Sequence, residues 1–226
     1  MGTGSSGSGS RGLSAGRSIS DYDGSRIDMS HAPLKYGKDD ASLKGAVKDV
    51  VSKFEDKRMK AKVEYGFLTD DKGNIITEKR GGKGGVAMYD RDWAKATVMS
   101  HIHPREAGML GGSFSEADID TFTYFNNVRT MRAVTKEGTY SMTKGKSFNA
   151  SGLKSYFNQR HSELRAGFSK TANALNKSYK SGQIDYDTYY KRYSREFNKF
   201  LSDSHRMILD GQKKFGYTYT LERRRK

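Results

Sequence analysis

Two histidines one residue apart, His101 and His103, are followed by a glycine-rich loop and then by two acidic residues, Asp118 and Asp120. Two imidazoles and one carboxylate can hold zinc, and a site with three protein ligands leaves the fourth position for water. Zinc lowers the pKa of such a water to about 7, so that hydroxide is available at neutral pH. The residue types therefore predict a hydrolytic Zn²⁺ site that contains both histidines and one of the two carboxylates.

The histidines need an element that points them the same way. Residues 96–100 are apolar and β-branched, which is typical of a short strand. Side chains alternate between the faces of a strand, so His101 and His103 would share one face and Ile102 would pack on the other. Pro104 has no amide hydrogen and would end the strand pairing.

The carboxylate is expected from the start of a helix. Ser113 or Ser115 is a candidate N-cap, and apolar residues follow it at helical spacing over residues 113–125. On a helix with 3.6 residues per turn, Asp118 and Asp120 are about 200° apart. Only one of them can face the metal.

A hydrolytic site also needs a proton acceptor, and Glu64 is the best candidate. It lies in residues 62–68, a strand-like stretch in which Glu64 would share a face with Gly66 and Leu68. An isolated Glu on such a face is either a carboxylate at the solvent edge or a placed general base.

These residues together resemble the motif of the JAMM (JAB/MPN-type) zinc metalloproteases, closest to bacterial, phage-type and RadC-like members. The motif is a Glu, then His-x-His-Pro, then Ser-x-x-Asp, and this chain has Glu64, His101-Ile102-His103-Pro104 and Ser115-Glu116-Ala117-Asp118. The resemblance covers about residues 45–145. The loop from Pro104 to Ala117 holds fourteen residues, which is longer than in the common pattern.

The resemblance implies an α/β (α+β) fold with a curved mixed sheet flanked by helices. It also implies that His101, His103 and Asp118 bind zinc, because the phasing of Ser-x-x-Asp selects the first of the two aspartates. Glu64 would take a proton from the water and return it to the leaving amine, and Ser115 would orient the water or stabilise the oxyanion. The reaction implied is hydrolysis of a peptide or isopeptide bond in a protein or peptide substrate.

Each residue also has a simpler structural interpretation. His101 and His103 could only pack at a strand end, and Asp118 could only complement the helix dipole. Ser115 could be an N-cap alone, and Glu64 an ordinary carboxylate on an edge strand. The remaining histidines stand alone in the sequence and are predicted to have no functional role: His31, His161 and His205.

Residues 1–32 are rich in Gly and Ser and predict a flexible arm, because they cannot bury enough apolar area to offset the entropy lost on ordering. Residues 1–10 could equally be non-native. An assembly partner could hold the arm.

Residues 33–226 are expected to form one JAMM-like domain. The spacing of apolar residues predicts a helix over residues 40–58 and two long antiparallel helices over about 150–213. A terminal strand is expected at about 216–222. The helical hairpin is thus predicted to be an insertion before the last strand.

The composition narrows the other possibilities. The chain has no Cys, which excludes disulfides and zinc–thiolate sites, and no apolar run approaches the roughly 20 residues that span a bilayer. We expect a cytoplasmic protein, or one associated with a virion or mobile element, that does not contact membranes. The net charge of +15 indicates either a solvated basic surface or a contact with nucleic acid or another polyanion.

Three functions remain open at this point. The first is a zinc-dependent hydrolase. The second is a non-enzymatic phage or mobile-element assembly protein that keeps the fold, and the third is a RadC-like protein associated with DNA.

Overall fold

The structure is a computed structural model that describes residues 43–104, 111–135 and 138–223. The arm expected over residues 1–32 lies outside these ranges. Within them no helix combines the length and the apolar character that crossing a membrane requires. The elements in chain order are α1 (Gly45–Arg58), β1 (Tyr65–Thr69), β2 (Ile75–Arg80), α2 (Asp90–Trp93), β3 (Val98–Ile102), α3 (Glu116–Tyr124), β4 (Thr130–Val134), β5 (Gly138–Lys144), α4 (Ala150–Lys180), α5 (Tyr186–Phe215) and β6 (Tyr217–Arg223).

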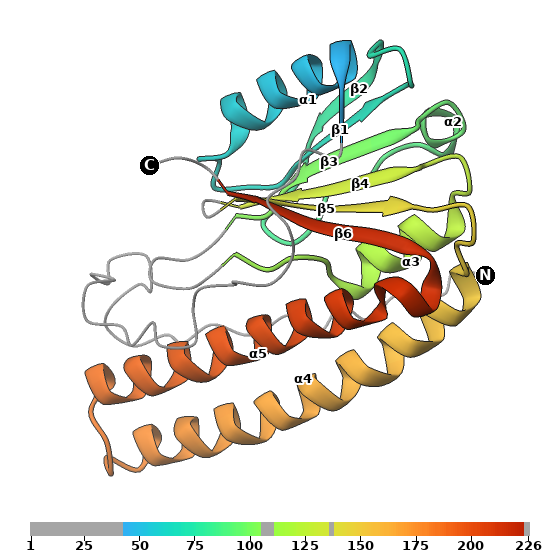
Figure 1. Cartoon of the computed structure of the whole chain (residues 1–226). Helices are drawn as coiled ribbons and strands as arrows, with labels where there is room; N and C mark the ends of the chain where they lie inside the picture. The colour runs from blue at the N-terminus through green and yellow to red at the C-terminus, as the bar shows by residue number, and fades with distance from the viewer. Residues whose placement is uncertain (1–42, 105–110, 136–137, 224–226) are drawn as a thin grey trace, which may run out of the picture.

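The strands form one mixed sheet in the order β2-β1-β3-β4-β5-β6 (Figure 1). β3 and β4 are parallel, whereas the other neighbours are antiparallel. A parallel pair needs a crossover, and α3 lies in the crossover between these two strands. One segment of the chain therefore connects the C-terminal end of β3 to the N-terminal end of α3. The predicted α+β class is confirmed, and so is the long helical hairpin before the last strand.

Helix α1 covers one face of the sheet (Figure 1). Val51 and Phe54 on this helix are buried against Phe67 of β1 and Ile102 of β3. The Phe54 and Phe67 rings stack with their centroids 4.5 Å apart. Ile102 is fully buried in this cluster, as the strand alternation predicted.

Helices α3, α4 and α5 cover the other face (Figure 1). The larger core lies between them and the sheet, and it includes Leu68 of β1, Met99 of β3, Phe122 of α3 and Ile208 of α5. His101 is two residues after Met99 on β3, so its side chain belongs to this face. The predicted site residues are thus on the side of the sheet that carries the helical hairpin.

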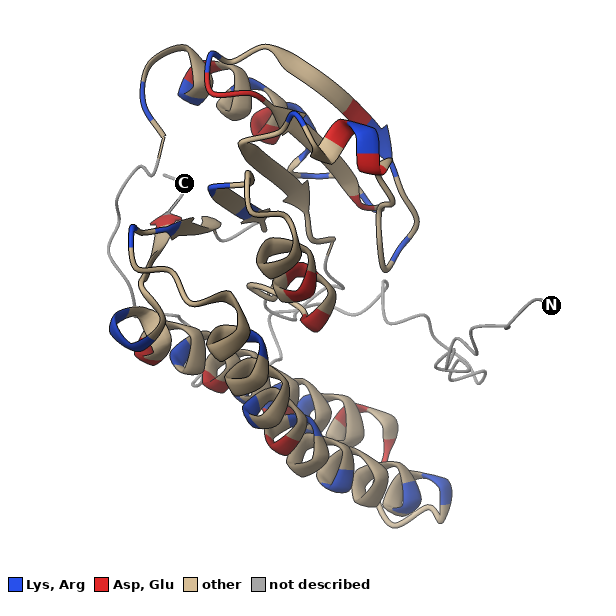
Figure 2. Cartoon of the chain, turned by 90° about the vertical axis from the view of Figure 1, so that its right-hand side faces the viewer, with Lys and Arg blue, Asp and Glu red and all other residues tan. Residues whose placement is uncertain are grey.

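The outer part of the hairpin is held together by aromatic rings, as their helical spacing predicted. Phe168 of α4 contacts Tyr193, Phe197 and Phe200 of α5, with ring centroids 5.5 to 5.6 Å apart. Figure 2 shows this part of the hairpin projecting beyond the sheet. Its stability therefore comes from the contact between the two helices and not from the main core.

The boundaries differ from the sequence prediction at Glu64. This residue precedes β1 and does not lie inside the strand. Its backbone is nevertheless held to the end of β2, because Glu64 N donates to Gly82 O and Gly81 N donates to Glu64 O, both at 2.8 Å. These two hydrogen bonds extend the pairing of the two chain segments just beyond the ends of β1 and β2.

Candidate metal centre

The two histidines lie at the C-terminal end of β3. His101 pairs with Gly66 of β1 and with Ala133 of β4, and only 1% of its surface is exposed. His103 follows the strand, and its amide donates to Val134 O at 2.8 Å, which continues the ladder past the end of β3. The sheet therefore fixes both backbones, and the two imidazole rings meet edge to face with centroids 4.5 Å apart.

The carboxylate comes from the first turn of α3. Ser115 is the N-cap, since its hydroxyl oxygen accepts a hydrogen bond from Asp118 N. Asp118 Oδ2 in turn accepts bonds from the amide and the hydroxyl of Ser115, both at 2.7 Å. This is a capping box with Asp in the position of the usual Glu or Gln. It holds one carboxylate oxygen in place and leaves Oδ1 directed at the histidines.

The three side chains converge on one point. The Nε2 atoms of His101 and His103 are 2.8 Å apart, and His101 Nε2 is 3.1 Å from Asp118 Oδ1. Asp118 Oδ2 is 3.5 Å from His103 Nε2. One ligand atom from each of the three residues lies within 4.8 Å of the others.

These distances and donor types fit a zinc ion. Tetrahedral zinc with bonds of 2.0–2.1 Å holds its ligand atoms about 3.3 Å apart. The separations here lie on both sides of this value: 2.8 Å between the two Nε2 atoms, 3.1 Å from His101 Nε2 to Asp118 Oδ1 and 3.5 Å from His103 Nε2 to Asp118 Oδ2. His103 Nδ1 lies 2.9 Å from the Gly112 carbonyl oxygen, which can only accept, so Nδ1 carries the hydrogen. The neutral imidazole then presents its lone pair at Nε2, as a metal ligand requires. His101 Nδ1 is buried and has no hydrogen-bond partner among the residues that the structure describes.

The electrostatics of the cluster favour an ionised carboxylate. Burial alone would raise the pKa of the Asp118 carboxyl, but the imidazoles of His101 and His103 more than offset it, and the pKa lies well below its ordinary value. Burial alone would lower the pKa of His103, but the Asp118 carboxylate and the Gly112 carbonyl raise it above its usual value. The Asp118 carboxylate is therefore held ionised opposite the two imidazoles.

Glu64 lies beside this cluster. β1 and β3 are antiparallel with Gly66 opposite His101, so continuing the register by two residues sets Glu64 opposite His103. Glu64 is half-buried, and burial raises the pKa of its carboxyl, although His103 and His101 act in the opposite direction and Asp118 adds to the increase. A carboxylate with a raised pKa next to a metal-ligand set is suited to accept and release a proton.

The choice between the two aspartates is settled by the helix geometry. Asp120 points away from the histidines and pairs with Lys154 of α4 at 3.0 Å, where both side chains are about half exposed. The structure therefore brings Asp118 and not Asp120 to the histidines. This agrees with their separation of about 200° on a helix.

Two contacts around the centre were not predicted from the sequence. His161 of α4, for which no functional role was predicted, has its Nδ1 2.9 Å from Oε1 of Glu116, the first residue of α3. Arg165 lies 3.6 Å from the other oxygen of Glu116. The second contact is the Gly112 carbonyl bond to His103. Glu116 and His161 are 45 residues apart and a backbone carbonyl has no side-chain signature, so no local spacing could have indicated either contact.

His205, for which no functional role was predicted either, has a structural partner. It is fully buried on α5, and its Nδ1 lies 2.7 Å from the Tyr219 hydroxyl of β6. This contact ties the base of the hairpin to the last strand.

No protein-family model, curated protein or solved structure matches this chain. Its own residues and geometry are therefore the observations that bear on its function.

Proposed function

We propose that this protein is a zinc-dependent hydrolase of the JAMM type that cleaves a peptide or isopeptide bond in a protein or peptide substrate. The supporting observation is the convergence of His101, His103 and Asp118 within 4.8 Å. The half-buried Glu64 precedes β1, and the register of β1 and β3 sets it opposite His103. Two imidazole ligands, one carboxylate ligand and a separate proton acceptor are the groups that such a reaction needs.

Each side chain has a definite task in this proposal. When bound, zinc would supply a Lewis acid that polarises a substrate carbonyl and acidifies a water. His101 and His103 would hold it through Nε2, and Asp118 through Oδ1. Glu64 would accept the proton of the attacking water and then donate it to the leaving amine.

Ser115 is best described as a positioning residue. Its hydroxyl donates to Asp118 Oδ2, so its only O–H hydrogen is already used. Stabilising an oxyanion, which the family resemblance implied, would require this hydroxyl to turn away from Asp118. The oxyanion role stays a prediction, whereas the capping role follows from the contacts.

The metal site can be tested by measuring bound zinc. We expect one equivalent of zinc in the purified wild-type protein after zinc loading and desalting. His101→Ala/His103→Ala should lose it, and Asp118→Asn should weaken it. Asp120→Asn is the matched control, because Asp120 has the same chemistry two residues away and faces Lys154. Loss of zinc in Asp120→Asn but not in Asp118→Asn would overturn the ligand assignment.

The reaction can be tested separately with Glu64→Gln. This variant should keep its zinc but lose cleavage of a panel of fluorogenic peptides and of peptides carrying a Gly-Gly isopeptide on Lys. A wild-type protein that binds zinc but cleaves nothing in the panel would contradict the hydrolase and favour an assembly protein. A Glu64→Gln variant as active as wild type would contradict the role of Glu64.

A further inference from the structure

The outer half of α4 carries positive charge only. Residues 165–180 contain four basic residues and no Asp or Glu: Arg165, Lys170, Lys177 and Lys180. At about 100° per residue these four lie within an arc of about 140°. The arc is on the side of α4 away from the apolar residues that pack on α5, which include Phe168 and Tyr179.

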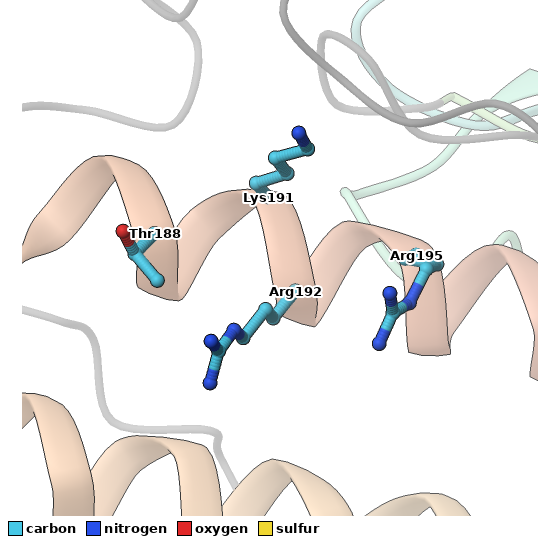
Figure 3. A pocket seen from close by; sticks show the side chains of 4 residues that line it. All are labelled: Thr188, Lys191, Arg192 and Arg195. Atoms are coloured by element: carbon cyan, nitrogen blue, oxygen red, sulfur yellow. The ribbon is translucent and has the colours of Figure 1, made fainter. Parts of the chain in front are cut away.

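The outer half of α5 also gathers basic residues on one side, although it contains two acidic residues, Asp187 and Glu196. Lys191, Arg192, Arg195 and Lys199 lie within an arc of about 100°, opposite the Tyr and Phe residues that face α4. With Thr188, the first three of these line a hollow of about 300 Å³. Figure 3 shows the four lining side chains following one another along the helix from Thr188 to Arg195.

These cations are available for a partner. Seven of the eight are exposed, and Arg195 is half-buried. Within the described ranges five of them form no ion pair: Lys170, Lys177, Lys180, Lys191 and Arg192. The other three pair with Glu116, Glu196 and Asp203, respectively: Arg165, Arg195 and Lys199. Unpaired like charges on adjacent helices repel one another, and a polyanion that neutralises them is attracted.

The lack of large exposed hydrophobic side chains on the hairpin, which the structure describes in full, indicates which kind of polyanion could bind there. The exposed large hydrophobic residues of the described chain are Ile75, Tyr89 and Tyr124, and none of them is on the hairpin. A helix that lies on a membrane needs an apolar face to insert, and a protein interface is usually anchored by aromatic side chains. A single-stranded nucleic acid is usually held by aromatic stacking platforms. A duplex needs none of these, because cations on its phosphates supply its non-specific binding.

We propose that the outer faces of α4 and α5 bind the phosphate backbone of a nucleic-acid duplex without reading its sequence. From Lys170 to Lys180 the helix rises about 15 Å, at 1.5 Å per residue, which is comparable with the length of four or five base pairs. This surface is separate from His101, His103 and Asp118. It would bring the proposed metal centre to targets associated with nucleic acid.

The test is the binding of a fluorescently labelled 20-base-pair DNA duplex and of the RNA duplex of the same sequence, measured by anisotropy at several salt concentrations. Two variants remove one face each: Lys170→Gln/Lys177→Gln/Lys180→Gln, and Lys191→Gln/Arg192→Gln/Arg195→Gln. We expect each to weaken binding about 10- to 100-fold at 0.1 M salt. Each should also reduce the slope of log K against log salt by up to about 2.7, since each phosphate contact contributes about 0.9.

The matched control is Lys48→Gln/Lys53→Gln/Lys57→Gln, which removes the same charge from exposed positions on α1. The affinity of this α1 variant for the duplex should be within about twofold of wild type if the faces of α4 and α5 are responsible for binding. Equal weakening in the control and the hairpin variants would overturn the proposal, as would tighter binding to vesicles of equal phosphatidylserine and phosphatidylcholine than to either duplex. His101→Ala/His103→Ala should bind the duplex like wild type, so failure of the metal site and failure of this surface give different results.

Discussion

At the scale of single residues, Asp118 has two roles that use different atoms. Its Oδ2 closes the N-terminal cap of α3 with Ser115, and its Oδ1 faces His101. A carboxylate fixed at one oxygen loses little further freedom when the other oxygen binds an ion, so the cap pre-organises the ligand. The stability of α3 and the affinity for metal should therefore change together when Ser115 is altered.

Ser115→Ala tests this link. Loss of an N-cap hydroxyl costs about 1 kcal/mol of stability, and loss of a group that orients a metal ligand weakens metal affinity about 10- to 100-fold. We expect both effects, measured by urea denaturation and by zinc competition with a chromogenic chelator. Ser162→Ala, at an exposed position of α4, is the control and should change neither. A normal zinc affinity in Ser115→Ala would show that Asp118 is placed without the cap.

Some residues of the candidate site could be predicted from the sequence and others could not. The types and phasing of His101, His103 and Asp118 could be read directly, because a strand and a helix start have fixed side-chain directions. The position of Glu64 relative to His103 depends on the strand register, which the sequence does not contain. The role of Gly112 could not be predicted, because its carbonyl oxygen is the same as that of any residue.

At the scale of elements, a buried ionic group joins three of them. Arg132 of β4 is 3% exposed. Its guanidinium donates to Glu55 of α1 and to Glu222 of β6, each at 2.7 Å. Glu55 also accepts bonds from Ser100 and Thr139. Because these hydrogen bonds occupy both carboxylate oxygens of Glu55 and the guanidinium of Arg132, the group fixes α1 and β6 relative to the middle of the sheet.

Arg132→Met should therefore be strongly destabilising. Removing one partner of a buried ion pair leaves an uncompensated charge, which typically costs 3–5 kcal/mol. Urea denaturation should show a loss of this size. Glu55→Gln/Arg132→Met should lose less than the single variant, because no buried Glu55 charge remains. Arg160→Met removes an exposed pair with Glu163 and should cost less than about 1 kcal/mol. Equal losses in Arg132→Met and Arg160→Met would contradict this account.

The elements themselves were more predictable than the contacts between them. The long helices could be predicted because their apolar residues recur over many turns, but α2, with four residues, is too short to give a periodic signal. The Arg132 group brings together residues 77 and 90 positions apart in the chain. Local patterns cannot indicate such partners, since charged residues usually lie on the surface.

At the scale of the whole molecule, the candidate metal centre joins parts that the chain keeps apart. His101 and His103 belong to the sheet and Asp118 to α3, and α3 is tied to α4 through Glu116 and His161. An ion bound at this point would link the sheet to the hairpin. The three side chains come together only in the folded protein, so a metal ion would bind the folded state and not the unfolded state. Metal binding should therefore stabilise the whole fold.

Zinc should therefore raise the free energy of unfolding by about 2.7 kcal/mol when its free concentration is 100 times its dissociation constant. Urea denaturation with buffered zinc and with EDTA measures this difference. The His101→Ala/His103→Ala variant should unfold at the same urea concentration in both conditions. If zinc stabilised the variant as much as wild type, the ion would be binding elsewhere.

The hairpin leaves the sheet at Lys144 and returns at Tyr217, and these two residues are directly paired across β5 and β6. Two helices that start and finish at neighbouring points can lengthen or shorten together by whole turns without shifting any strand. Only the inner turns, which carry His161, His205 and Ile208, are bound to the rest of the molecule by packing. The length of the outer turns can thus change during evolution while His101, His103 and Asp118 keep their places.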